Sequence, residues 1–334
     1  MSNILITGGA GFVGSELGKH LIKLGHNVQL FDNLEYGYRD NFEDNNELAK
    51  SFILADVRDT DFHKYLNEIE IVFHFAGISA LPECETNPVK ALEVNTTSVA
   101  NVLHACRKSR VRKFIFASTS AVYENNDPTT PFREDMQVYP NLIYATSKYN
   151  AEQICKSFAQ NYDMDIVICR FFNVFGPHQD YRRKYPPFTS YLVREIIAGH
   201  KPTVFNTADV KRDYIYIQDL LEYLLHIMNS PKQYYAEIFN LGSGYGFSAI
   251  EIVNAIFDIM KIPIDYATGD PSAFWDKYDN LFNGNYNLSR KRICKEVYKH
   301  CIADIQKTVN EFSFSPQVNL INGLKSIIQF QQHK

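Results

Sequence analysis

A tyrosine and a lysine stand four residues apart in "YATSK", where Tyr144 and Lys148 lie near the start of a long amphipathic segment at 141–162. If this segment is a helix, positions i and i+4 share one face, so the phenol and the ammonium can converge on one point. A phenol with a pKa of about 10 is a poor base at neutral pH unless a nearby cation favours its anion. The pair is therefore either a base with its electrostatic helper or a chance pair on a solvated helix.

Glycines recur in "ILITGGAGFVGSEL", after a first apolar run and at the start of a helical pattern. Gly8, Gly11 and Gly14 would permit a tight turn, let the backbone approach a pyrophosphate and bring helix and strand together. Asp32 ends the second apolar run, where a carboxylate can bind an adenosine ribose and repels a 2′-phosphate. The pattern predicts a site for NAD rather than NADP. The alternative is that the glycines form an ordinary turn and that the aspartate only caps a helix.

Polar and small residues also follow other apolar runs. Hydroxyl residues fill 118–120 after "KFIFA", Asp56 follows "SFILA", and Gly77 ends "IVFHFAG". Ligands bind at the carboxyl ends of strands in open parallel sheets, so these residues are expected beside the cofactor. His74 has no neighbouring His or Cys in the sequence and is predicted to pack within its strand, and no metal site is predicted.

The elements that would position these residues alternate along the first half of the chain. Short apolar runs such as "NILIT", "NVQLFD", "KFIFAST" and "DIVICRF" alternate with helical patterns at 12–24, 87–109 and 141–162. This alternation predicts an α/β fold, a doubly wound parallel sheet with helices on both faces. The regular alternation weakens after about residue 170, where a smaller substrate-binding lobe is expected.

Composition narrows the class of protein. The 334 residues are 45% hydrophobic and 22% charged, with a formal net charge of -4. Basic clusters are short and isolated, so neither nucleic acid nor a membrane is an expected partner. The six cysteines are widely spaced without a Cys-x-x-Cys pair, and no basic leader or cleavage site is recognised before the first apolar run. Reduced thiols and a cytoplasmic location are expected.

A family resemblance joins these features. In the order "TGGAGFVG", "FAG", "STSAVY", "YATSK", "RFFNVFGP" and "RDYIYIQD", the chain resembles the extended short-chain dehydrogenase/reductase family. The resemblance implies a Rossmann domain over 1–170 with a return segment at about 213–243, and a nucleotide-sugar-binding lobe formed by 171–212 and 244–334. It implies that Tyr144 is the acid/base, with its pKa lowered by Lys148 and the nicotinamide charge. Lys148 would also bind the nicotinamide ribose, and Thr119 would bridge the sugar hydroxyl.

The resemblance also implies two sets of binding residues. Those expected to contact NAD are Gly8, Gly11, Phe12, Val13, Asp32, Asn33, Asp56, Val57, Phe75, Ala76, Gly77, Ser79, Asn95, Tyr144 and Lys148. Those expected to contact the nucleotide sugar are Ser79, Thr119, Ser120, Asn173, Phe205, Arg212, Lys277 and Gly284. Arg212 suits a diphosphate because its planar fork gives paired hydrogen bonds, although a salt bridge to Asp213 or Asp209 is an alternative. Phe205 is either a base-stacking wall or a core aromatic.

The segment "KYDNLFNGNYNLSR" is similar to the one in which nucleotide-sugar epimerases carry Arg-x-Gly-Asp and then Ala-Asp-x-Ser. Lys277 stands at the arginine position and Asn287 at the aspartate position. Three residues before Asn287, Gly284 falls where such epimerases have a gatekeeper, and a small residue there leaves room for an N-acetyl group. A plain turn glycine is the alternative.

The residues after Thr119 discriminate among reactions. Relatives that dehydrate the sugar carry Asp-Glu there, whereas decarboxylases carry a glutamate, and C3/C5 epimerases a cysteine, at the position of Ala121. Alanine cannot transfer a proton, which favours a 4-epimerase that acts on a UDP-hexose or UDP-N-acetylhexosamine through a 4-keto intermediate. The alternatives are another nucleotide-sugar enzyme of the family (4-ketosugar reductase or dehydrogenase, decarboxylase, dehydratase) and a nonenzymatic NAD-binding sensor.

Two further features follow from the resemblance. Segments 87–109 and 141–162 resemble the helix pair of a homodimer interface, although their apolar positions fit helix-on-sheet packing as well. Glu124 stands where relatives usually have glycine, and the sequence predicts no role for it.

Overall fold

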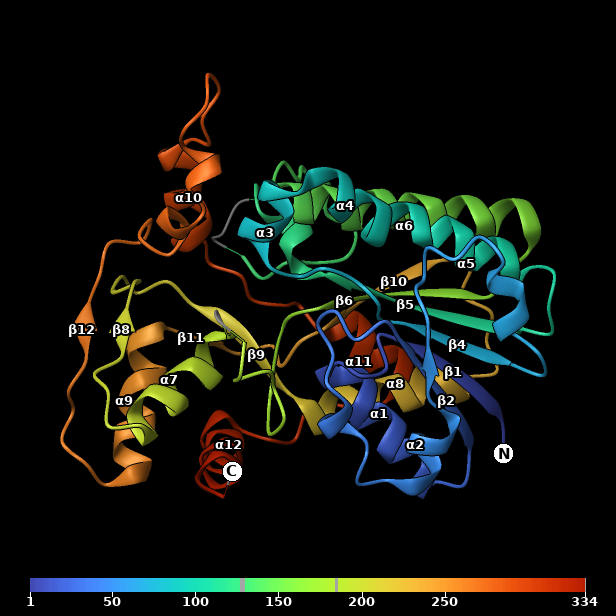
Figure 1. Cartoon of the computed structure of the whole chain (residues 1–334), viewed down its shortest axis with the longest axis horizontal. Coiled ribbons are helices and arrows are strands. Elements are labelled where there is room, and N and C mark those ends of the chain that lie inside the picture. Colours follow the sequence, from blue (N-terminus) through green and yellow to red (C-terminus); the bar gives the residue numbers. More distant parts are fainter. Residues whose placement is uncertain (127–129, 184–185, 334) are drawn as a thin grey trace.

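The computed structural model describes residues 1–126, 130–183 and 186–333, which form a large sheet covered by helices and a smaller lobe beside it (Figure 1). The sheet has seven strands in the order β10-β6-β5-β4-β1-β2-β3, paired in parallel. They are β1 (Asn3–Thr7), β2 (Asn27–Asp32), β3 (Ile53–Leu54), β4 (Ile71–His74), β5 (Lys113–Thr119), β6 (Ile166–Phe171) and β10 (Glu237–Leu241). The order reverses beside β1, which creates a crevice at the carboxyl ends of the strands. The predicted doubly wound sheet is confirmed.

Side chains of successive strand residues enter opposite layers of the core. Ile4 and Ile6 pack with Leu17 in one buried cluster, whereas Leu5 packs with Val102 in the cluster on the other face. Helices α1 (Phe12–Lys23), α2 (Asn46–Ser51), α8 (Ile217–Asn229) and α11 (Gln306–Phe312) cover the first face. Helices α3 (Leu81–Thr86), α4 (Pro88–Leu92), α5 (Ser98–Cys106) and α6 (Ile143–Tyr162) cover the second (Figure 1).

The helix expected over 87–109 is interrupted. A wide π-type turn, Glu93–Thr97, separates α4 from α5. It contains the buried Asn95, whose side chain accepts the Ile78 N–H at 2.8 Å and donates to the Ser147 hydroxyl at 3.0 Å. The extra backbone atoms of such a turn let one side chain reach out of helical register. Asn95 therefore ties the loop after β4 to helix α6.

The smaller lobe is built from short strands and helices. A three-stranded sheet contains β7 (Asn173–Phe175), β9 (Arg212–Tyr216) and β11 (Gly246–Phe247), and β8 (Thr203–Val204) pairs with β12 (Ala267–Thr268). Helices α7 (Phe188–Ile197), α9 (Ala249–Met260) and α12 (Leu320–Gln332) share one apolar cluster. Helix α10 (Arg290–Val297) lies nearer to α3, and the turn before it protrudes at the top left of Figure 1. The short 3-10 turns are Arg39–Asn41, Phe62–Tyr65, Ser120–Tyr123, Trp275–Lys277 and Asp279–Leu281.

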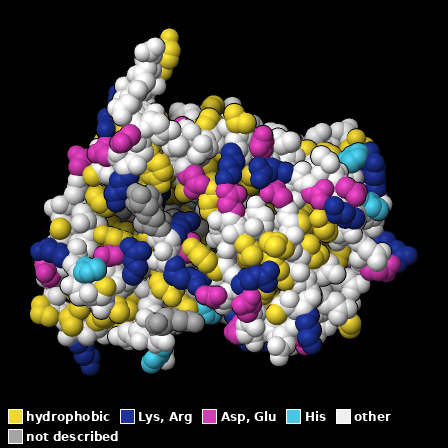
Figure 2. Space-filling model, in the orientation of Figure 1, with side chains coloured by type: hydrophobic (Ala, Val, Ile, Leu, Met, Phe, Trp, Pro, Cys, Tyr) yellow, Lys and Arg dark blue, Asp and Glu magenta, His cyan; other side chains and the backbone are white. Residues whose placement is uncertain are grey.

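Segments after residue 170 return to the large sheet. Strand β10 pairs with β6, α8 packs against α1, and α11 packs against β10. Helix α8 and strand β10 lie in the expected return segment at 213–243. Helix α11 lies outside it, in a later segment that also returns to the large sheet. The domain boundaries stay a prediction. None of the helices in the described ranges has the length and apolar character that a bilayer crossing requires. On the face shown in Figure 2, basic and acidic side chains are interspersed.

Candidate active site

The glycine turn after β1 lets the chain come close to the neighbouring strand end. Gly8 has a φ of +69°, and a Cβ on it would lie 2.7 Å from the Ala76 nitrogen. A Cβ on Gly14 would lie 2.3 Å from the Gly8 carbonyl oxygen. Larger residues are therefore excluded at both positions. The turn and the first residues of α1 line a cavity of about 260 Å³, which fits the cradle that a dinucleotide pyrophosphate requires.

Asp32 lies at the end of β2 in the same cavity. Its carboxylate accepts the N–H groups of Ala10 at 3.1 Å and Leu34 at 2.7 Å. Burial raises its pKa, and these hydrogen bonds oppose the increase. Each carboxylate oxygen can accept a further hydrogen bond, so the group can also receive two ribose hydroxyls. The adjacent Asp56 is held by the Arg58 guanidinium, which keeps the pKa of Asp56 well below its usual range.

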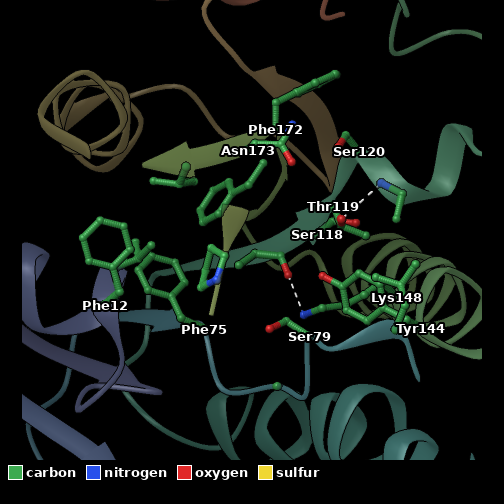
Figure 3. Close-up of a pocket in the computed structure, with 18 of the residues that line it drawn as sticks. Phe12, Phe75, Ser79, Ser118, Thr119, Ser120, Tyr144, Lys148, Phe172 and Asn173 are labelled. Atoms are coloured by element: carbon green, nitrogen blue, oxygen red, sulfur yellow. Dashed lines mark hydrogen bonds between the residues drawn. The ribbon is translucent and has the colours of Figure 1, made fainter. Parts of the chain in front are cut away.

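Tyr144, Lys148 and Thr119 line one side of a second cavity of about 470 Å³, with Phe12 and Phe75 on the other side (Figure 3). Lys148 Nζ donates to the Ala117 carbonyl at 2.7 Å and lies over the Phe116 ring. Burial lowers the pKa of Lys148 to about 8. The predicted i and i+4 pair therefore reaches one site, at the carboxyl end of β5.

The pKa of Tyr144 differs from the expectation. Burial raises it to about 12, and a hydrogen bond with Thr119 opposes this increase. The effect of burial thus outweighs the lowering that was expected from Lys148, whose ammonium donates its hydrogen bond to the Ala117 carbonyl. The protein groups alone thus favour the neutral phenol, which can donate a proton but needs a further positive charge nearby to act as a base.

A buried network fixes α6 to the sheet behind these residues. Glu152, one turn beyond Lys148, accepts the Ser118 hydroxyl at 2.5 Å and two nitrogens of Arg170 at 2.9 and 2.7 Å. Arg170 also donates to the Tyr123 hydroxyl at 2.8 Å. A buried charge pair is tolerated when hydrogen bonds satisfy it in this way. The network sets the distance between α6 and the strand that ends at Thr119.

The smaller lobe contributes a charged group of side chains to the larger cavity. Arg212 donates to the Glu296 carbonyl at 2.5 Å and lies 3.6 Å from its carboxylate. Lys299 Nζ lies 3.2 Å from the same carboxylate. Arg212 thus pairs with Glu296 rather than with Asp213, whose carboxylate accepts backbone N–H groups of 243, 244 and 303. Sequence reasoning missed Lys299 and Glu296, which no motif identifies.

Most of the expected binding residues line these two cavities. All of the residues expected to contact NAD line one of the two cavities, except Asn95, which lies behind Gly77. Of those expected to contact the nucleotide sugar, the cavity linings contain Ser79, Thr119, Ser120, Asn173 and Arg212.

Three expected substrate residues lie elsewhere. Phe205 packs against Gly269, where β8 meets β12. Lys277 ends a 3-10 turn, and Gly284 lies in the exposed turn before α10 with its N–H bonded to Asn287. None of the three is among the described residues that line either cavity.

A second segment shares part of the Ala-Asp-x-Ser pattern expected at Asn287, where Ser289 matches the serine of the pattern. Ala303-Asp304-Ile305-Gln306 has the alanine and the aspartate but not the serine, and it ends at the first residue of α11. Asp304 accepts the Gln306 N–H at 2.9 Å. In this segment, the same step of three residues back from the aspartate gives Cys301, a second gatekeeper candidate beside Gly284. Cys301 is buried; burial raises its pKa, and a hydrogen bond with Ser120 is among the contacts that oppose this. Because Ser120 lines the larger cavity, Cys301 lies directly behind its wall.

Known proteins resemble this chain in sequence. The model of the NAD dependent epimerase/dehydratase family matches residues 4–242. A putative UDP-glucose 4-epimerase of Methanocaldococcus jannaschii is 29% identical over 99% of this chain and 98% of the relative. A UDP-glucose 4-epimerase of Streptomyces lividans is 31% identical over 78% of this chain and 82% of the relative. A UDP-N-acetyl-alpha-D-glucosaminuronate decarboxylase of Bacillus cytotoxicus is 30% identical over 98% and 96%, respectively.

Solved structures share the whole fold. The UDP-glucose 4-epimerase of Thermotoga maritima with UDP-glucose has a TM-score of 0.85 at 25% identity, covering 99% of both chains. The UDP-N-acetylglucosamine 4-epimerase of Methanobrevibacter ruminantium with UDP-N-acetylmuramic acid has a TM-score of 0.85 at 26% identity, covering 99% of this chain and 98% of the other. The UDP-glucuronic acid 4-epimerase of Bacillus cereus with UDP-glucuronic acid and NAD has a TM-score of 0.82 at 25% identity, covering 99% of both.

Proposed function

The chain belongs to the NAD-dependent epimerase/dehydratase family, and from this premise we propose that it inverts C4 of a UDP-hexose or UDP-N-acetylhexosamine through a 4-keto intermediate. NAD is the cofactor. The observation that carries the proposal is the group formed by Tyr144, Lys148 and Thr119 on one wall of the larger cavity. It supplies one proton-transfer group, which is what oxidation and reduction at a single carbon require.

Each of these residues has one task in the proposed reaction. Thr119 orients the C4 hydroxyl beside Tyr144, and Tyr144 takes its proton and returns it after the ketose has turned. NAD, when bound, provides the acceptor and the donor for the C4 hydride. Lys148 holds a positive charge near the phenol, and its hydrogen bond to the Ala117 carbonyl restrains α6 against β5. The positive nicotinamide ring would add the charge that the protein alone lacks for lowering the pKa of Tyr144.

The small number of acids and bases among the described residues of the larger cavity supports epimerisation over the alternatives. Ala121 follows Ser120 on the cavity wall, and Glu296 is the one carboxylate among the described residues that line the larger cavity. Glu296 is held by Arg212 and Lys299, and these cations help to keep its pKa low. The relative from Bacillus cytotoxicus keeps a decarboxylase as the second candidate, but Ala121 offers it no proton carrier. A nonenzymatic sensor would have no need for the phenol.

The diphosphate of the substrate fits the two cations of the smaller lobe. Arg212 and Lys299 face the cavity from β9 and from the segment after α10, and Asn173 lines it from β7. Guanidinium and ammonium groups bind phosphate oxygens through charge-assisted hydrogen bonds. The nucleotide sugars named for the similar structures all carry a UDP group. We take UDP as the nucleotide for this chain as well.

The size of the residue behind Ser120 supports an N-acetylhexosamine substrate. Cys301 is small, and at the gatekeeper position a small residue leaves room for the acetamido group. Gly284, the gatekeeper expected from the sequence, is not among the described residues that line either cavity. Access for UDP-N-acetylglucosamine is therefore proposed on the basis of Cys301.

A homodimer is the proposed assembly. Val89 of α4 and Tyr162 of α6 expose apolar side chains on the helices of the second face. A dimer that buries this face would elute at twice the chain mass in light scattering, and a monomer would contradict it.

Proton NMR of the purified protein with UDP-N-acetylglucosamine, without added NAD, tests the proposed function. A second anomeric signal from the galacto epimer is expected, and it should settle to an equilibrium mixture. A protein that carries NAD but converts neither this sugar nor UDP-glucose nor UDP-glucuronate would overturn the assignment. A reductase or dehydrogenase would instead change the absorbance of the nicotinamide steadily.

A further inference from the structure

The start of α6 is held by carboxylates from outside the helix. Glu124 accepts the N–H groups of Asn141 and of Leu142, the latter at 2.9 Å, and Glu85 accepts the Ile143 N–H at 2.5 Å. The first N–H groups of a helix have no partner within it, and they attract negative charge. The capping position, Leu142, has no side-chain acceptor. The two glutamates therefore replace the usual cap, two residues before Tyr144.

Helix α10 of the smaller lobe joins the same contact. Arg292 pairs with Glu124 through Nη2, and its Nε donates to the Asn141 side chain at 2.6 Å. The side chains are 1% exposed for Glu124 and 13% for Arg292. Exposed ion pairs contribute little, but breaking a buried pair leaves an uncompensated charge. The contact is thus a fixed connection between two parts of the molecule.

Helix α10 also touches the cavity cations. Glu296, one turn beyond Arg292, holds Arg212 and Lys299. Arg292 Nη1 lies 3.9 Å from the Glu296 carboxylate, and it is buried without a hydrogen-bond acceptor. If a diphosphate binds Arg212 and Lys299, the Glu296 carboxylate can turn to this spare donor. One helix therefore contacts both the proposed diphosphate site and the start of the helix that carries Tyr144.

We propose that Glu124 and Arg292 form a positioning link that sets Tyr144 in register with the sugar and transmits diphosphate binding from Glu296 to the start of α6. Glutamate stands where the family resemblance predicts glycine, which has no carboxylate for this task. The inference rests on the proposed function for its kinetic readout. Its structural part can be measured without turnover.

Variants of the two linked residues test the kinetic part. Glu124→Gln and Arg292→Met should each lower kcat by about 10-fold and change KM by less than about 2-fold, because misplacing a catalytic group affects the reacting geometry. The double variant should lose no more than either single variant, since both break one link. Arg292→Lys should recover part of the loss. A rise in KM alone, or multiplied losses in the double variant, would overturn the link.

Lys295→Met is the matched control. Lys295 lies on the same helix and donates to the Asn125 side chain at 2.6 Å, next to Glu124, but has no contact with α6 among the described hydrogen bonds. Its kcat should stay within about 2-fold of the wild type, as expected for an exposed surface contact. An equal loss in this variant would show that any contact between α10 and the 124–126 segment suffices, which contradicts the specific link.

Hydrogen exchange of backbone amides separates the inference from the proposed function. The amides of Asn141 and Leu142, which donate to Glu124, and that of Thr146, which closes the first turn of α6, should exchange faster in Glu124→Gln than in the wild type. Addition of UDP should slow their exchange in the wild type but not in Arg292→Met. This result would support the link even if no epimerisation were found, and unchanged exchange in both variants would refute it even in an active epimerase.

Discussion

Lys148 donates a 2.7 Å hydrogen bond to the Ala117 carbonyl, and this contact holds helix α6 against the strand that ends at Thr119. The ammonium is therefore both a structural tie and a charge beside the phenol. Lys148→Met removes both while keeping a long apolar side chain. Turnover should fall by about 100-fold, as expected when a group that assists acid–base catalysis is removed. Steady-state assays of the epimer ratio measure this loss. Retained activity would show that Lys148 is a structural residue alone.

Removal of the phenol hydroxyl tests the proton carrier. Tyr144→Phe keeps the ring that packs in the cavity wall but cannot exchange a proton. Turnover should drop by at least about 100-fold, and bound NAD and the melting temperature should remain close to those of the wild type. Near-normal activity in this variant is incompatible with the assigned role.

Two lysines of the smaller lobe provide a matched comparison for the diphosphate site. Lys299 lines the cavity beside Arg212, whereas Lys277 does not line it. Lys299→Met should raise KM for the UDP-sugar by about 10-fold, as expected for loss of one charge-assisted contact to phosphate, with a smaller change in kcat. Lys277→Met should leave both constants within about 2-fold. A higher KM in Lys277→Met but not in Lys299→Met would instead support Lys277 as the phosphate-binding residue, as expected from the sequence.

Enlarging the residue behind Ser120 should change sugar selectivity. Cys301→Tyr is expected to lower kcat/KM for UDP-N-acetylglucosamine by at least about 10-fold relative to UDP-glucose, because a filled pocket rejects the extra acetamido group. Retained activity on UDP-glucose controls for folding, since overpacking a buried site also destabilises it. Gly284→Tyr in the exposed turn should leave kcat/KM unchanged for both substrates. Loss of the N-acetyl sugar in the Gly284 variant would contradict the assignment.

Asp213 should contribute a specific pH dependence to stability. Burial raises its pKa to about 6 in the folded protein, whereas the unfolded group has a pKa of about 4. As pH rises from about 4 to 6, the unfolded chain releases this proton first, so stability falls. The free energy of unfolding of the wild type should therefore fall relative to Asp213→Asn by up to about 3 kcal/mol over this range. Parallel curves for both proteins in urea titrations would contradict the raised pKa.

Local patterns located the nucleotide side of the site. Gly8, Gly14 and Asp32 belong to a turn and a strand end whose geometry follows from a short stretch of sequence. Tyr144 and Lys148 are fixed by one helical turn. The interruption at Glu93–Thr97 has no such signal, because tertiary contacts of the Asn95 side chain accompany it.

Long-range contacts account for what the sequence did not predict. Arg292 lies 168 positions from Glu124, and Lys299 reaches the cavity only because the chain after α10 returns beside β9. The segments at Asn287 and at Ala303-Asp304 each keep part of Ala-Asp-x-Ser, so the pattern by itself fits either Gly284 or Cys301 as the gatekeeper. Contacts of this kind depend on the whole fold, so they cannot be predicted from the spacing of residues along the chain.

The most direct test of the central proposal is proton NMR of the reaction in D₂O with UDP-N-acetylglucosamine and no added NAD. Hydride return to C4 within one active site predicts that the galacto epimer appears with hydrogen, not deuterium, at C4, C3 and C5. No epimer with any UDP-hexose, or deuterium entering the sugar ring during conversion, would contradict a 4-epimerase that works through Tyr144.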